Sequence, residues 1–191
     1  MEEKTLHSDI RFTGRVFQVE EMLVRLSDGT SANREIVRHS GGAAVVAIDT
    51  AGQVVLVRQY RKAAEQIMLE IPAGKLEPEE DPAACALREL REETGYRSGP
   101  LQPLMTLYPT PGYCSEQLHL FYTDQIESGV SAPDEGELLE PVLLPLTDCL
   151  EAIRDGRIRD AKTVVGILMA SARFSVKPDR AAAGGEGGGR K

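Results

Sequence analysis

Three glutamates and one arginine in the middle of the chain could do chemistry together: Glu89, Glu92, Glu93 and Arg88. Spacings of three and four residues place the carboxylates on one face of an α-helix, where they repel one another. Arg88 is the only basic residue within that stripe. A hard divalent cation such as magnesium prefers oxygen ligands and would remove the repulsion. We therefore expect the three carboxylates to converge on one or more such ions beside a negatively charged substrate.

A solvated acidic helix face is the alternative interpretation, because runs of charge on helices commonly face water. The surrounding sequence favours chemistry. It contains, in order, Gly74, five residues, Glu80, seven residues, Arg88-Glu89-Leu90, one residue, Glu92-Glu93, one residue and Gly95. This string resembles the Nudix box at every fixed polar and glycine position. The Nudix box is the motif of a hydrolase family that cleaves diphosphate bonds. Tyr96 departs from the family pattern, which has an aliphatic residue there, but this position packs rather than reacts.

The helix that carries the carboxylates has clear ends in the sequence. Asp81-Pro82 combines an N-cap carboxylate with a proline at the first helical position, and Gly95 supplies the stop. We therefore expect a helix over residues 82–94. Its core face is predicted from the helical repeat to contain Ala83, Leu87, Leu90 and Thr94.

Strands are expected on both sides of this helix. Alternating and β-branched runs predict a hairpin over residues 15–26 and 34–39 around Asp28-Gly29, a buried antiparallel pair over 43–49 and 53–60, and strands over 101–108, 117–126 and 140–146. Two further helices are expected, one capped by Thr147 and the other by Asp160 or Thr163.

The resemblance implies an α/β fold, namely the Nudix α/β/α sandwich with a mixed sheet, plus an N-terminal antiparallel β-hairpin segment. We expect residues 1–40 to form that N-terminal segment, as a dimerisation element, and residues 41–177 to form the Nudix hydrolase domain. Residues 178–191 are mostly alanine and glycine, so we expect a disordered tail.

Composition excludes several classes of protein. A formal net charge of −8 disfavours a nucleic-acid partner, because the overall field repels a phosphate backbone. Cys85, Cys114 and Cys149 form no CxxC pair, so neither a disulfide framework nor a zinc site is indicated. No apolar run is long enough to cross a bilayer and the amino terminus does not resemble a secretory signal, so we expect no membrane partner and a cytoplasmic location.

The segments before the box, residues 56–61 (Leu-Val-Arg-Gln-Tyr-Arg) and 69–74 (Leu-Glu-Ile-Pro-Ala-Gly), resemble the ADP-ribose pyrophosphatase branch of the family. This resemblance implies that the backbone carbonyl of Ala73 is a metal ligand. It also implies that Arg34 and Arg61 bind the phosphates or ribose, and that Glu70 contacts the substrate by hydrogen bonding. A planar guanidinium suits this task because it holds phosphate oxygens in a bidentate manner.

Two features after the box extend the resemblance. Pro111 lies sixteen residues after Gly95, near the position of a proline that marks this branch, although a Pro-Gly turn is the alternative interpretation. The acidic segment 134–137 resembles the loop that supplies late catalytic carboxylates. By that comparison Glu135 is the expected base for the attacking water and Glu137 an additional metal ligand.

The resulting hypothesis is a magnesium-dependent hydrolysis of ADP-ribose to AMP and ribose 5-phosphate, with manganese as a substitute ion. Glu89, Glu92, Glu93, Glu137 and the Ala73 carbonyl would hold the ions, Glu135 and Glu92 would take part in catalysis, and Arg88 would orient the carboxylates. Glu80 is assigned to metal binding or loop support. The remaining alternatives are another nucleotide sugar or dinucleotide, such as GDP-mannose or diadenosine polyphosphate, and a non-catalytic ligand sensor. Similar enzymes are homodimers, which we also expect of this chain.

Overall fold

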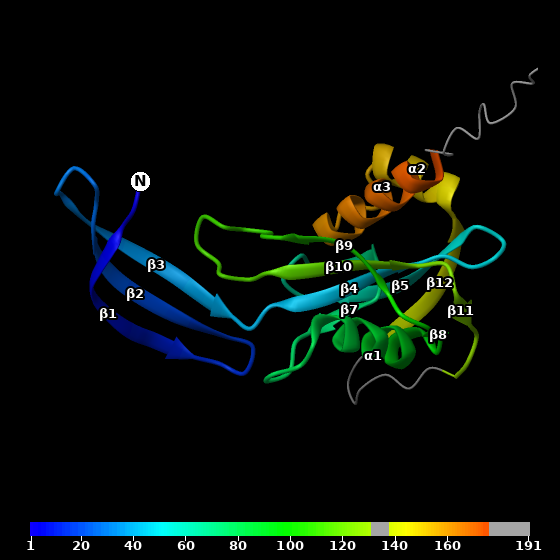
Figure 1. Cartoon of the computed structure of the whole chain (residues 1–191), viewed down its shortest axis with the longest axis horizontal. Coiled ribbons are helices and arrows are strands. Elements are labelled where there is room, and N and C mark those ends of the chain that lie inside the picture. Colours follow the sequence, from blue (N-terminus) through cyan, green and yellow to red (C-terminus); the bar gives the residue numbers. More distant parts are fainter. Residues whose placement is uncertain (131–137, 176–191) are drawn as a thin grey trace, which may run out of the picture.

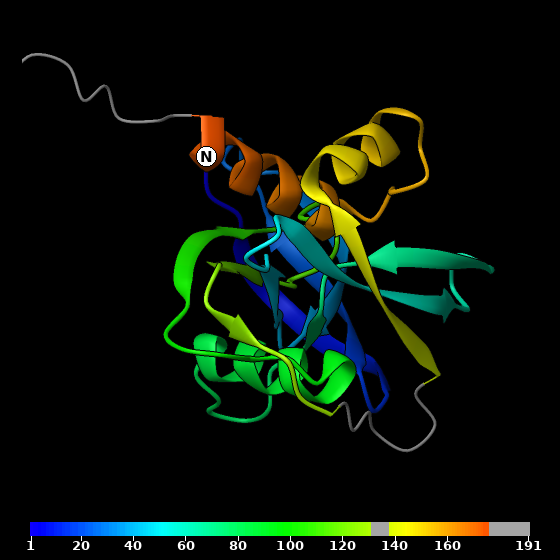
Figure 2. The ribbon, with the colours of Figure 1, turned by 90° about the vertical axis from the view of Figure 1, so that its right-hand side faces the viewer.

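Helices cover both sides of a layer of β-strands in the computed structural model, which describes residues 1–130 and 138–175 (Figure 1). Helices α2 (Leu146–Arg154) and α3 (Ala161–Ser175) lie on one side, and α1 (Pro82–Thr94) lies on the other. Figure 2 shows the same three layers after a quarter turn. The expected α/β/α sandwich is therefore confirmed. None of the helices in the described residues is long and apolar enough to cross a membrane.

The sheet between the helices is mixed, as expected. Four strands lie in the order β7 (Ala73–Lys75), β4 (Gly42–Ala47), β10 (Leu118–Thr123) and β9 (Gln102–Leu107). Strands β4 and β10 run parallel, and the other neighbours are antiparallel. A second sheet has the order β12 (Leu139–Pro145), β5 (Gln53–Arg61) and β6 (Gln66–Glu70), and a short pair joins β8 (Arg97–Ser98) to β11 (Ile126–Glu127).

Strand β4 is the centre of the core because all six of its residues are buried. Successive side chains of a strand point to opposite faces of the sheet. Ala43, Val45 and Ala47 accordingly belong to the apolar cluster that contains Leu90 of α1. Ala44 and Val46 belong to the other cluster, with residues of α2 and α3. The covering of both faces explains why this segment is a continuous apolar run.

The expectation that residues 43–49 and 53–60 form an antiparallel pair is wrong. Strands β4 and β5 lie in different sheets, and the two segments meet beside their turn, through the isolated bridge between Ile48 and Val54 and the hydrogen bond from the N–H of Asp49 to the carbonyl of Gln53. Each strand already has two neighbours along its edges, β7 and β10 for β4, and β12 and β6 for β5. A short connection suggested a hairpin, but the long-range partners take both edges.

The amino-terminal segment forms a separate three-stranded antiparallel sheet of β1 (Lys4–Thr13), β2 (Phe17–Arg25) and β3 (Ser31–His39), which extends away from the layers (Figure 1). The hairpin around Asp28-Gly29 is confirmed as the β2–β3 connection, where Gly29 has a positive φ of 86°. Strand β1 was not expected. All ten of its residues are exposed, so burial leaves no alternating pattern in it.

The ends of the helices follow the local signals in two of three cases. Helix α1 has the expected bounds, and the Asp81 carboxylate accepts hydrogen bonds from the backbone N–H groups of Ala83 and Ala84. Asp160, one of the two expected caps of α3, accepts from the N–H of Thr163. The expected Thr147 cap is wrong, because α2 begins one residue earlier, directly after Pro145. The expected tail over 178–191 lies outside the described residues.

Candidate active site

The carboxylates of α1 meet the turn at β7. Glu93, only 4% exposed, accepts a hydrogen bond from the backbone N–H of Ala73 at 3.1 Å. The Glu89 carboxylate lies against Gly74, since a Cβ built on that glycine would be 1.7 Å from Glu89 Oε1. A side chain at position 74 would therefore occupy the space of this carboxylate. The structure thus brings Ala73, Gly74, Glu89 and Glu93 together.

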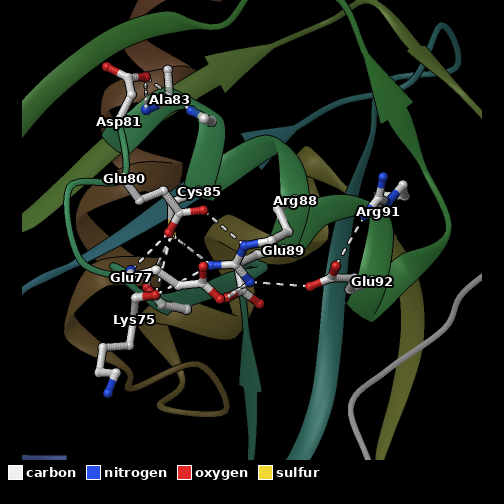
Figure 3. A network of polar contacts seen from close by, with 12 residues as sticks. Lys75, Glu77, Glu80, Asp81, Ala83, Cys85, Arg88, Glu89, Arg91 and Glu92 are labelled. Carbon is white, nitrogen blue, oxygen red and sulfur yellow. Dashed lines mark hydrogen bonds and ion pairs between the residues drawn. The ribbon is translucent and has the colours of Figure 1, made fainter.

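Arg88 lies among three carboxylates (Figure 3). Its Nε donates to Glu80 at 2.9 Å, and its Nη1 donates to Glu89 at 2.7 Å and to Glu92 at 3.2 Å. The hydrogen bond from Arg88 lowers the pKa of Glu80 to about 2, and the same contact raises the pKa of Arg88. Glu80 is therefore ionised at neutral pH, and the Arg88 guanidinium offsets part of the mutual repulsion of the carboxylates it contacts.

The expectation that three carboxylates converge on one point is not met. Within residues 1–130 and 138–175, no group of three or more His, Cys, Asp or Glu side chains is close enough to hold a metal ion. Successive helical residues are rotated by about 100°, so Glu92 and Glu93 leave the helix in different directions. Glu93 reaches Ala73, whereas Glu92 contacts Arg88 and also accepts from Arg91 at 3.1 Å.

The residues at the β7 turn nevertheless fit a hard divalent cation. Two carboxylates one helical turn apart, Glu89 and Glu93, reach the same backbone turn, and the missing side chain of Gly74 leaves room for one of them. Oxygen donors of this kind suit magnesium, whose coordination is ordinarily completed by water and by substrate phosphates. A cage made only of protein carboxylates is therefore not required.

A cavity of about 460 Å³ opens beside this turn. Four of the residues that the sequence assigned to the site line it: Arg61, Glu70, Ala73 and Gly74. Arg61 donates to Glu70 through Nε at 2.7 Å and through Nη2 at 2.8 Å, so the two side chains form a bidentate pair. Both were expected to contact substrate, but in the structure they contact each other.

The cavity also contains residues that the sequence did not single out, among them His39, Glu116 and Lys162. Lys162 donates to Glu70, which is only 1% exposed, and lies 3.1 Å from Asp160. Burial opposes ionisation of Glu70, but the hydrogen bond from Arg61 and the charge of Lys162 outweigh it and lower the pKa of Glu70 to about 2. The Asp-Ala-Lys-Thr sequence at 160–163 indicated only a helix start, since the partner of Lys162 is far away in the chain.

Two expected substrate-binding residues do not line this cavity. Arg34 lies on β3, where it forms a pair with Glu3 at 2.6 Å. Pro111 lines a separate depression of about 310 Å³ together with Tyr108 and Tyr113, next to β3. Within a single chain the structure therefore does not bring either residue to Arg61. Glu135 and Glu137 lie outside the described residues.

Comparisons with known proteins agree with the fold and with the box. Residues 38–164 match the family model described as the NUDIX domain. The chain is 42% identical to the methanol dehydrogenase activator of Bacillus methanolicus over 168 residues, which is 87% of this chain and 91% of that protein. It is 38% identical to the ADP-ribose pyrophosphatase of Bacillus subtilis over 169 residues, again 87% and 91% of the two chains. It is 36% identical to the GDP-mannose pyrophosphatase of Salmonella typhimurium over 155 residues, 72% and 81% of the two chains.

The fold is also found among solved structures. A crystal structure of an ADP compounds hydrolase has a TM-score of 0.80 at 24% identity, covering 92% of this chain and 95% of that one. The matched family region includes the box, the cavity residues Arg61, Glu70 and Lys162, and the two sheets that position them. The chain therefore belongs to the Nudix family of hydrolases.

Proposed function

We propose that the chain hydrolyses the diphosphate bond of ADP-ribose and releases AMP and ribose 5-phosphate. The observation that carries this proposal is the meeting of Glu89 and Glu93 with the Ala73–Gly74 turn at the edge of a cavity that also holds Arg61. Support comes from the relative in Bacillus subtilis, an ADP-ribose pyrophosphatase that aligns with 87% of this chain.

Members of this family generally need a divalent metal ion, and we propose magnesium, with manganese as a substitute. When bound, such an ion neutralises diphosphate oxygens and lowers the pKa of water. The Ala73 carbonyl, Glu89 and Glu93 would hold it. Glu92 stays a candidate ligand and catalytic group, although its side chain contacts Arg88 and Arg91 and not the backbone at β7.

The remaining roles fall to side chains that bind, orient or move a proton. Arg88 orients Glu89 and Glu92 through the hydrogen bonds from its Nη1, and Glu80 anchors the other side of its guanidinium. Arg61 binds a phosphate or the adjoining ribose within the cavity. We keep Glu135 as the base that takes a proton from the attacking water and Glu137 as a further ligand, on the sequence resemblance.

GDP-mannose is the second candidate substrate, because relatives that are GDP-mannose pyrophosphatases are 36% identical to the chain. Their alignment covers 72% of the chain, against 87% for the Bacillus subtilis enzyme. The wider coverage favours ADP-ribose. The name of the Bacillus methanolicus relative gives an effect on another enzyme and no substrate, so it does not bear on the choice between nucleotides.

A substrate panel tests the proposal. The purified chain is assayed with ADP-ribose, GDP-mannose and diadenosine polyphosphates, with magnesium and manganese compared, and products are identified by chromatography. We expect the highest kcat/KM with ADP-ribose. In Glu93→Gln we expect kcat/KM to fall by roughly 100-fold or more, because a metal ligand should matter at least as much as the residues that hydrogen-bond to metal ligands. Glu140→Gln, which changes an exposed carboxylate of a surface pair, is the control. Wild-type turnover in both Glu89→Gln and Glu93→Gln would refute the metal assignment.

We also propose that the chain is a homodimer through residues 1–40 and works in the cytoplasm, with residues 41–177 as the catalytic domain. Support for the dimer is the apolar surface of the separate amino-terminal sheet, which exposes Leu6, Ile10, Phe12, Phe17 and Leu23. Support for the location is the state of the three cysteines, all of which are free.

A further inference from the structure

A group of charges with the buried pair Glu70 and Lys162 at its centre joins α3 to the end of β6. Glu70 is the last residue of β6 and accepts hydrogen bonds from both Arg61 and Lys162. The side chain of Lys162 is only 9% exposed and lies 3.1 Å from Asp160. Two cations and two anions therefore balance each other around the buried Glu70–Lys162 pair, where an uncompensated charge is costly.

The first turn of α3 also holds the backbone that follows Glu70. The hydroxyl of Thr163 donates to Asp160 at 2.6 Å and accepts from the backbone N–H of Ile71 at 2.9 Å. Ile71 lies between Glu70 and the turn at Ala73. The start of α3 thus fixes both the side chain of Glu70 and the segment that leads to the β7 turn.

The orientation of Arg61 depends on this group. Arg61 gives Nε and Nη2 to Glu70, and within the described part of the chain its Nη1 makes no hydrogen bond. Because Arg61 lines the cavity, its guanidinium has one edge bound to Glu70 and another for a ligand. The charges of Glu70, Asp160 and Glu93 all act on the Arg61 guanidinium, so without Lys162 these three carboxylates would compete for it.

We propose that Lys162 is a positioning residue for substrate binding: it holds Glu70 so that Arg61 presents the Nη1 edge of its guanidinium to the phosphate or ribose of the substrate. The inference rests on the proposed function for the chemistry of that ligand. It adds a residue on α3 to a site otherwise built from β5, β6, β7 and α1.

The test compares Lys162→Met and Lys162→Arg with the wild-type enzyme. Binding of the non-hydrolysable analogue α,β-methylene-ADP-ribose is measured by calorimetry without metal, and KM, kcat and the thermal midpoint are measured separately. We expect Lys162→Met to weaken binding and raise KM by roughly 10-fold while kcat changes less, because Arg61 contacts substrate before and during the reaction. Lys162→Arg keeps the charge and should restore binding. Arg157→Met removes a cation from the exposed pair with Asp155 and should behave as wild type.

Lys162→Gln replaces Lys162→Met if the latter does not fold, since it keeps a donor for Glu70 without the charge. Unchanged binding and KM in an uncharged variant that folds would overturn the proposal, as would a lower thermal midpoint without any change in binding. Loss of binding in Lys162→Arg would equally show that charge is not what positions Arg61. If the wild-type enzyme neither binds nor cleaves ADP-ribose compounds, the proposed substrate is wrong, and the same variants are then compared with GDP-mannose.

Discussion

At the scale of single residues, the site combines local sequence with contacts that the sequence does not contain. The box letters are local, so the carboxylates and Arg88 were identified from their spacing. The direction of each side chain depends on its angle around α1, which is why Glu92 and Glu93 diverge. Lys162 was missed for a different reason, because its partner Glu70 is on another element and only the fold brings them together.

Replacement of Gly74 by alanine should damage the site without unfolding the chain. The added Cβ would lie 1.7 Å from Glu89 Oε1, the far end of a flexible side chain, so the carboxylate has to move. We expect Gly74→Ala to lower magnesium affinity and kcat/KM by roughly 10- to 100-fold, with little change in the free energy of unfolding. Magnesium titrations of activity and denaturant unfolding measure the two effects. Gly112→Ala, whose Cβ would meet nothing within 4 Å, controls for stability. Wild-type magnesium affinity in Gly74→Ala would contradict the position given to Glu89.

The Glu80–Arg88 contact makes the free energy of unfolding depend on pH in the acidic range. The pKa of Glu80 is lowered to about 2, so the folded state binds fewer protons than the unfolded state at pH values between about 2 and the ordinary pKa near 4.5. This contribution is complete above the ordinary pKa and is lost as pH falls toward 2. The free energy of unfolding falls between pH 6 and pH 3. We expect this fall to be smaller in Glu80→Gln than in the wild type, by on the order of 1 kcal/mol. Urea unfolding without metal is the measurement. An identical pH slope in variant and wild type would mean that Arg88 does not hold this carboxylate in solution.

At the scale of elements, a helix with strong local signals and the β2–β3 hairpin were predicted, whereas the pairing of strands far apart in the sequence was not. Asp81 and Pro82 specify the start of α1 and Gly95 its end, so each end is encoded by residues beside it, and the helix begins and ends where they predict. The pairing of β4 with β10 joins Gly42 to Leu118, so no short window contains it. The incorrect β4–β5 pair came from reading a short connection as a hairpin. Strand β1 has no buried face, so burial does not impose on its sequence the strict alternation of apolar and polar residues from which a strand is predicted.

The packing of α3 on β4 should be sensitive to a single methyl group. A Cβ on Gly166 would lie 2.8 Å from Val46 Cγ2 and 3.2 Å from Ile71 Cδ1, both in the core. Alanine favours a helix more than glycine by about 1 kcal/mol, but crowding of a packed core costs about 1–3 kcal/mol. We expect Gly166→Ala to lower the unfolding free energy by about 1 kcal/mol in denaturant titrations. Gly99→Ala, whose nearest contact would be 3.9 Å away, should not do so. A more stable Gly166→Ala variant would show that α3 can shift freely on the sheet.

At the scale of the whole molecule, the amino-terminal sheet contacts the layers through Val37 and His39 of β3 and through the β1–β2 turn. The carbonyl of Arg15, in the β1–β2 turn, accepts from Lys75 at 3.4 Å, and the N–H of Val37 on β3 donates to the carbonyl of Tyr113 at 2.7 Å. Much of the apolar surface of this sheet remains exposed, including Ile10 at 61% and Phe12 at 52%. A surface of this kind is costly in water unless something covers it.

A charge placed on that surface should separate the proposed dimer. We expect wild-type chain to sediment as a dimer at micromolar concentration and Ile10→Asp to shift toward the monomer by at least 10-fold in dissociation constant, because a buried unpaired carboxylate costs more than about 1.4 kcal/mol. Sedimentation equilibrium measures this, with circular dichroism as the check on folding. Leu168→Asp, which changes an exposed apolar residue of α3, should remain dimeric. A wild-type chain that is monomeric throughout would remove the dimer from the proposal.

The parallel pairing of β4 with β10 sets an order of events during synthesis. The ribosome completes β4 and the whole box before it makes Leu118, so the centre of the sheet lacks one of its two neighbours while α1 is already available. Lys162 and Thr163 emerge later still, and until then Glu70 lacks one of its cations and Ile71 its hydroxyl partner. A nascent chain that has not yet reached α3 therefore lacks one wall of the cavity, which Asp160, Ala161 and Lys162 line.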